Sequence, residues 1–89
     1  MENYQEVILI FVKFGDEEEF SFRHKLNDIH IVDELEERNY FLMTNRQEET
    51  LINNIRKDID KGKRSNKKEY SKHGKKLKIR WVLTNYTEI

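Results

Sequence analysis

One segment restricts the fold more than any other: EVILIFVKF, at positions 6–14. β-Branched and aromatic residues dominate it, and it is too short for a typical helix, so it predicts a β-strand. Both faces of this strand are apolar. One face carries Val7, Leu9 and Phe11, and the other carries Ile8, Ile10, Val12 and Phe14. A strand of this kind is usually central in its sheet and covered on both sides.

Three further segments have the pattern of strands. Residues 19–26, EFSFRHKL, alternate apolar and polar side chains after a GDEE turn, so they predict the second arm of a β-hairpin. Residues 40–44, YFLMT, predict a third strand. Residues 76–86 alternate again and predict a fourth strand, whose inner face carries Leu77, Ile79, Trp81 and Leu83.

Residues 46–61 have the clearest helical pattern in the chain. Asn45 as the cap and Glu48 three residues later match a capping box, and Gly62 suits the position just after a helix. Four apolar residues recur at the helical period and form one stripe: Leu51, Ile52, Ile55 and Ile59. In residues 27–39 the pattern fits either a short helix or a strand edge, and we favour the helix or a turn.

Together these segments predict one domain, residues 1–89, with an α+β fold in the order ββ(α)βαβ. Its four-stranded, mostly antiparallel sheet carries the main helix, about 46–61, on one face. Residues 63–74, KRSNKKEYSKHG, lack periodicity, so we interpret them as a mobile basic loop. The helix covers only one face of the first strand. We therefore expect residues 28–38 or a second copy to cover the other, and we predict a homodimer.

The charges are segregated along the chain. It has 17 basic and 17 acidic side chains, yet residues 61–81 contain ten Lys or Arg and one acidic residue, Glu69. Such a stretch suits a polyanion, or it pairs with the acidic part of its own fold. As a binding surface it comprises Lys63, Arg64, Lys67, Lys68, Lys72, Lys75, Lys76, Lys78 and Arg80.

The acidic residues form an alternative binding surface in the turn after the first strand and in residues 33–37. Its members are Asp16, Glu17, Glu18, Glu19, Asp33, Glu34, Glu36 and Glu37. They lack the ligand spacing of an EF-hand. His30 and Asp33 form a pair without a third ligand, so we predict no metal and no cofactor.

The chain has no motif of a familiar catalytic chemistry. It lacks GxxxxGK[ST], GxGxxG, GxSxG, HExxH and CxxC. Tyr70 and His73 carry groups suited to acid–base chemistry, but they lie in the expected loop, and catalysis needs fixed geometry. We therefore expect a protein that is not an enzyme.

The chain begins with a short apolar run and no basic leader, which is unlike a signal peptide. The run is also far shorter than the ~20 residues that span a bilayer. The absence of Cys fits a reducing compartment. We expect a cytoplasmic protein without a membrane partner.

These features favour a small protein-binding inhibitor or accessory factor that acts on a nucleic-acid-processing host machine. The composition lacks Ala and Pro and is rich in Lys, Asn and Ile, as is typical of AT-rich genomes such as those of some phages and mobile elements. The segregated charges suit steering onto a charged partner protein. The alternative is a protein that binds DNA or RNA directly through residues 61–80.

Overall fold

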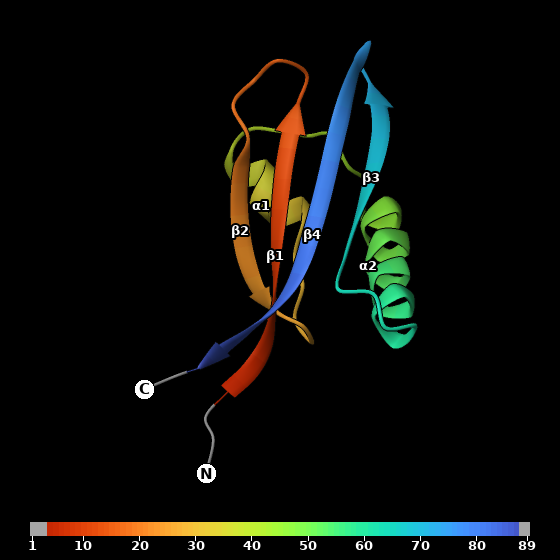
Figure 1. Cartoon of the computed structure of the whole chain (residues 1–89). Coiled ribbons are helices and arrows are strands. Elements are labelled where there is room, and N and C mark those ends of the chain that lie inside the picture. Colours follow the sequence, from red (N-terminus) through yellow and green to blue (C-terminus); the bar gives the residue numbers. More distant parts are fainter. Residues whose placement is uncertain (1–3, 88–89) are drawn as a thin grey trace.

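The computed structural model describes residues 4–87, with side chains from residue 6 to residue 84. Four strands form one antiparallel sheet in the order β2-β1-β4-β3, with two helices against it (Figure 1). In chain order the elements are β1 (Tyr4–Phe14), β2 (Phe20–Lys25), α1 (Val32–Glu37), α2 (Asn45–Asp60), β3 (Ser65–Lys72) and β4 (Lys75–Thr87). The predicted α+β class, the four-stranded antiparallel sheet and the main helix are confirmed.

The hydrophobic core lies on one face of β1, the central strand. Ile8, Ile10 and Val12 of β1 are completely buried. The register places Ile10 beside Phe22 of β2 and Trp81 of β4, so the inner faces of three strands form one apolar surface. Removing this surface from water is the main stabilising contribution, at about 25 cal/mol per Å² of apolar area.

Both helices pack on this same face of the sheet. Leu35 of α1 and Ile55 of α2 belong to one apolar cluster with Ile10. In Figure 1, α1 lies behind β1 and β2, and α2 runs beside β3. The short helix favoured in residues 27–39 is confirmed, but the expectation that residues 28–38 cover the second face of β1 is wrong. Within the described residues no helix covers that second face, which we call the open face.

The third strand is not where its pattern indicated. Residues 40–44 have no strand pairing, and their apolar character reflects Leu42 and Met43, which are buried in the core. The strand is instead β3, within the segment predicted as a mobile loop, so the order is ββααββ. β3 is an edge strand on which only Tyr70 packs against the core, and its other side chains are polar, so it lacks the apolar alternation of a half-buried strand.

A two-residue turn joins β3 to β4. His73 and Gly74 have positive φ angles of 52° and 74°, and the flanking residues Lys72 and Lys75 pair across the hairpin. Positive φ at both central residues defines the type I′ turn, whose twist matches that of two antiparallel strands. The dipeptide His-Gly is therefore the local sequence signal for this hairpin.

α2 begins with a different capping box from the one expected. The Thr44 hydroxyl accepts a hydrogen bond from the backbone N–H of Gln47, and the Gln47 side chain accepts one from the N–H of Thr44, both at 3.1 Å. The prediction that Asn45 and Glu48 form this box is wrong by one residue. Gly62, with φ of 91°, follows the helix as predicted.

Glu48 instead joins the two helices. Its Oε2 atom accepts hydrogen bonds from the backbone N–H groups of Ile31 and Val32, at 2.9 and 2.7 Å. These groups form the N-terminus of α1, whose own N-cap residue, Ile31, makes no side-chain capping bond. A carboxylate here satisfies two N–H groups and interacts favourably with the helix dipole. The first turn of α2 thus caps α1.

The Glu48→Gln variant should be destabilised by about 1–2 kcal/mol, because neutral hydrogen bonds replace charge-assisted ones at a partly buried helix end. Urea unfolding followed by fluorescence of Trp81, the single Trp, measures this change. Glu49→Gln is the matched control, since it removes the same charge from an exposed neighbouring position. Equal stability of the two variants would contradict the capping role of Glu48.

Candidate nucleic-acid interface

The open face has an apolar centre and basic surroundings. Leu9 and Phe11 of β1 and Val82 of β4 are half-buried there and form an apolar strip. The basic side chains on the same face are Lys13 of β1, Arg23 and Lys25 of β2, Lys67 of β3, and Lys76, Lys78 and Arg80 of β4. Among the described side chains, the acidic ones on this face are Glu69 of β3 and, at its rim, Glu19. Positive charge therefore dominates the surface.

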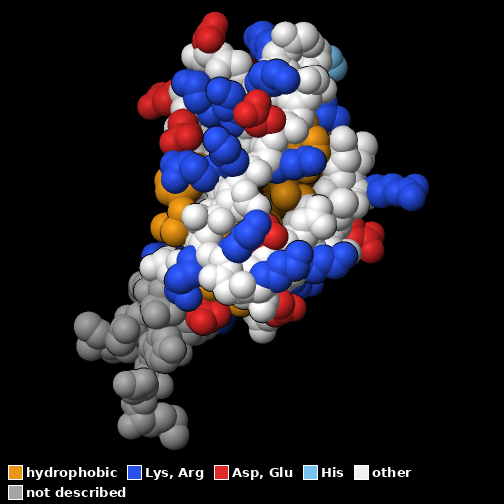
Figure 2. Space-filling model, turned by 45° about the vertical axis from the view of Figure 1, so that its right-hand side comes forward, with side chains coloured by type: hydrophobic (Ala, Val, Ile, Leu, Met, Phe, Trp, Pro, Cys, Tyr) orange, Lys and Arg blue, Asp and Glu red, His pale blue; other side chains and the backbone are white. Residues whose placement is uncertain are grey.

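Two pairs of cations stand directly opposite each other on neighbouring strands. Lys13 pairs with Lys78, and Lys67 pairs with Arg80. Like charges in these positions destabilise a sheet. An anion placed between them removes the repulsion, because its oxygens accept hydrogen bonds from both cations. Figure 2 is turned so that β3 and α2 come toward the reader. On the side of the molecule seen there, Lys and Arg side chains are spread widely, with apolar surface between them.

Arg80 lies over its cross-strand neighbour Phe11. The guanidinium carbon is 4.0 Å from the centre of the ring. Such a cation–π contact contributes about 0.5–1 kcal/mol at an exposed site, and it fixes the orientation of the guanidinium group. Glu19 approaches Arg80 to 3.8 Å, but both side chains are nearly half exposed, at 46% and 48%, so water and salt weaken this ion pair. The contact with Phe11 thus orients the guanidinium group of Arg80, while about half of the side chain remains exposed to an anionic ligand.

Two shallow hollows meet at Arg80 and Lys67. The larger, about 350 Å³, is lined by Ser65, Asn66, Lys67, Arg80 and Val82. The smaller, about 170 Å³, includes the ring of Phe11 and the carboxylates of Glu19 and Glu69. The lining of the larger hollow contains no carboxylate, so it is the more favourable of the two for a negatively charged ligand.

The structure divides the predicted basic residues between different surfaces. On the open face lie Lys67, Lys76, Lys78 and Arg80. Lys68 and Lys72 point to the helix side of β3, where Lys72 Nζ donates a hydrogen bond to Gln47 at 3.1 Å. Lys75 lies over the ring of Phe14 on that side, 5.4 Å from its centre.

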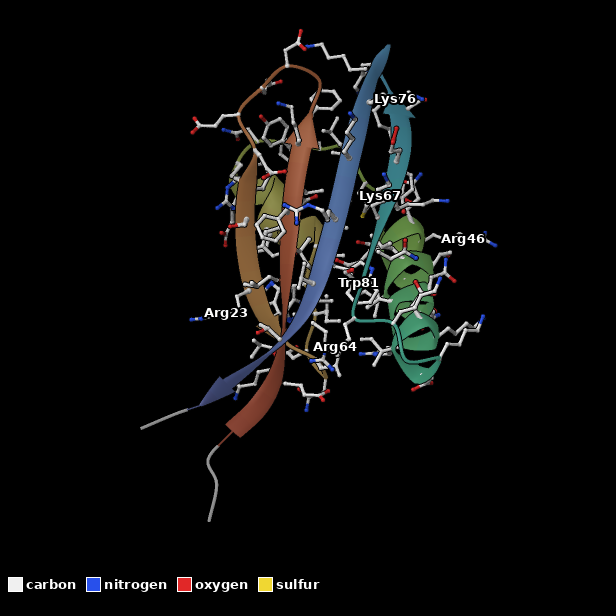
Figure 3. All side chains as sticks on the ribbon, viewed as in Figure 1. Arg23, Arg46, Arg64, Lys67, Lys76 and Trp81 are labelled. Atoms are coloured by element: carbon white, nitrogen blue, oxygen red, sulfur yellow. The ribbon has the colours of Figure 1, made fainter. Side chains whose placement is uncertain are left out.

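Lys63 and Arg64 lie in the connection between α2 and β3. Lys63 is 3.8 Å from Asp58 of α2, so part of its charge is compensated within the fold. Figure 3 shows Arg64 near the start of β3, away from Lys67 and Lys76. The continuous basic stretch of the sequence is therefore not one continuous surface.

Sequence reasoning missed the cations that β1 and β2 add to the open face, Lys13, Arg23 and Lys25. They are distant from residues 61–80 in the chain, and antiparallel pairing brings them onto the same face. Figure 3 shows Arg23 at one side of the sheet and Lys67 toward the other. Arg23 and Lys25 occupy polar positions of an alternating strand, which was the available signal. Alternation alone does not reveal which outward faces join.

The acidic alternative surface occupies the β1–β2 connection and α1. Its residues are Asp16, Glu17, Glu18 and Glu19 in the connection, and Asp33, Glu34, Glu36 and Glu37 in α1. Tyr40 links these parts, because its hydroxyl donates a hydrogen bond to Glu17 and its ring stacks on Phe20. Glu34 already has partners within the fold: His24 at 3.0 Å and Arg38 at 3.9 Å.

The predicted homodimer remains a prediction. It was based on the second apolar face of β1, and that face now proves to have Leu9 and Phe11 half-buried among cations. In a two-fold symmetric dimer the same surface of both subunits forms the interface. A dimer formed through the open face would therefore place the cations of one subunit against those of the other. An anionic macromolecule complements this surface better than a second copy does.

Within residues 4–87, no three His, Asp or Glu side chains are placed to hold a metal ion. Over the same residues, no helix combines the length and the apolar character needed to cross a membrane. Comparison with family models, curated proteins and solved structures found no match to this chain. Its function is therefore inferred from surface chemistry.

Tyr40→Phe should lower stability at neutral pH and have less effect at alkaline pH. The hydrogen bond to Glu17 raises the pKa of Tyr40 above its ordinary value of 10.0, with burial and the charge of Glu17 as further causes. The folded state thus holds the phenol proton more tightly than the unfolded state does. This contribution is complete below pH 10.0 and is lost as the pH rises through the folded-state pKa.

Urea unfolding of wild type and Tyr40→Phe, from about pH 7 to about pH 11, measures the difference in stability. Glu17→Gln should reduce the same pH dependence because it removes the charged acceptor, whereas Glu18→Gln serves as the neighbouring control. A difference between wild type and Tyr40→Phe that stays constant to the alkaline limit would contradict the role of this hydrogen bond.

Proposed function

We propose that this protein is a non-catalytic nucleic-acid-binding protein and that the open face of its sheet is the binding surface. The main support is the pair of opposed cations Lys67 and Arg80, together with Lys13 opposite Lys78. These pairs do not stabilise the isolated fold, whereas the phosphates of a nucleic acid neutralise them. The apolar strip between the cations offers contact area to bases or sugars.

A net charge of zero is compatible with this function because the charges lie on different sides of the molecule. The carboxylates of α1 lie on the helix side of the sheet, opposite the open face. A phosphate backbone is attracted to one side and repelled by the other, so the field orients the protein during the encounter. Binding requires a local positive surface, and a positive total charge is not needed.

The acidic side of the molecule supports a second candidate, a protein-binding inhibitor or accessory factor of a nucleic-acid-processing host machine. Phe41 is 71% exposed, and it is the one large hydrophobic side chain with such exposure among the described residues. It follows the carboxylates of α1 by a few residues, Glu36 and Glu37 being the nearest in the chain. An exposed ring that follows several carboxylates in the chain suits a basic protein surface. A cytoplasmic location and an origin in a phage or mobile element belong to both proposals.

The double variant Lys67→Glu with Lys78→Glu should weaken the binding of labelled single-stranded DNA and make it less sensitive to salt. Five phosphate contacts with a single strand give a log–log salt slope of about −3.5, and each lost contact makes the slope shallower by about 0.7. Fluorescence anisotropy titrations at several salt concentrations measure both quantities. The two side chains are exposed, so the variant should fold, as emission from the buried Trp81 will verify.

Arg46→Glu with Lys57→Glu is the matched control, because it changes the net charge equally at exposed positions of α2. Figure 3 shows Arg46 projecting from α2 away from the sheet. Equal losses of affinity in both double variants would mean that only total charge matters and that the open face is not the site. Failure of the wild type to bind any nucleic acid, together with capture of a protein that Phe41→Ala abolishes, would favour the second candidate.

A further inference from the structure

The larger hollow on the open face is lined by the planar guanidinium group of Arg80, the apolar side chain of Val82 and the charged side chain of Lys67. Arg80 and Val82 contribute from β4, and Ser65 and Lys67 contribute from β3. Its volume of about 350 Å³ lies at the lower end of the range of about 300–1,000 Å³ that is usual for pockets holding small organic groups. A hollow of this size and chemistry suits one flat, polar ring with an adjoining anion.

Arg80 is pre-oriented for stacking. One side of its guanidinium group lies over Phe11, at 4.0 Å from the ring centre, and the side chain also lines the larger hollow. Guanidinium planes stack on nucleobases as aromatic rings do, and contact with an aromatic ring reduces the ordering required on binding. Lysine carries the same charge but has no plane to stack.

Asn66 fixes the edge of the hollow. Its amide nitrogen donates a hydrogen bond to Asp58 of α2 at 2.8 Å, and its amide oxygen accepts one from the N–H of Lys67 at 2.8 Å. The bond to Asp58 attaches this end of β3 to α2, and the bond from Lys67 fixes the Asn66 side chain within β3. The wall that carries Lys67 is therefore supported from the helix layer.

We propose that the larger hollow is a nucleobase site, in which a base stacks on the Arg80 guanidinium over Val82 while Lys67 binds the adjoining phosphate. The site rests on the proposed function and narrows it to single-stranded nucleic acid. In a duplex the bases are stacked on one another and only their edges are accessible, whereas an unpaired base presents a free ring face. Within the described residues, the open face is a sheet surface from which no helix or loop projects to enter a groove.

The test is Arg80→Lys, compared with Arg46→Lys as the matched control on α2. The probes are a labelled oligothymidylate, a labelled DNA duplex of the same length and inorganic polyphosphate as a competitor. Loss of one stacked base corresponds to a loss in affinity of about 5- to 140-fold. Arg80→Lys should show this loss with oligothymidylate, keep the wild-type salt slope, and bind duplex and polyphosphate as wild type does. Arg46→Lys should change none of these.

The alternative results separate the two proposals. If wild type binds duplex as tightly as single strands, or if Arg80→Lys weakens all probes equally or none, the base site is wrong while nucleic-acid binding stands. If wild type binds oligothymidylate and duplex no better than it binds a neutral polymer, the proposed function fails as well. A melting temperature of Arg80→Lys close to that of wild type shows that its losses come from the site.

Discussion

The rest of the structure depends on the packing of both helices against the same face of β1. Leu35 of α1 and Ile55 of α2 are buried together with Ile10 in one cluster. Glu48 ties the helices to each other by capping α1 from the first turn of α2. The two helices thus form one layer, and within the described residues no other helix is available for the second face of the sheet.

A sheet that is covered on one side needs side chains that make its other side compatible with water. In this protein long basic side chains have that position, since their aliphatic stems pack on apolar surface while their charged ends reach solvent. Arg80 over Phe11 is one such case. The same arrangement concentrates positive charge on the open face, while the carboxylates of α1 lie beyond the sheet. Shielding the apolar strip and attracting an anion are thus two results of the same side chains.

The sequence predicts those elements that bury one regular stripe or face. The helix around Leu51 and Ile55 and the strands on either side of β1 have clear periodicity, because burial selects apolar residues at fixed spacing. β3 packs only Tyr70 against the core, so its sequence shows no apolar alternation. Leu42 and its neighbours are apolar because an irregular segment also packs into the core. Only part of the candidate site could be predicted from the sequence. Lys67 and Arg80 lie in the basic stretch, but Lys13 joins them only through strand pairing, which alternation does not encode.

The most direct measurement is an NMR titration of isotope-labelled protein with unlabelled oligothymidylate, following the backbone amide signals. Binding on the open face predicts the largest chemical-shift changes in β4, β3 and the middle of β1, centred on Phe11, Lys67 and Arg80. The amides of α1, on the far side of the sheet, should change little. Changes concentrated in α1 and in the connection of residues 16–19, with β3 and β4 unaffected, would contradict the assignment of the open face as the binding surface.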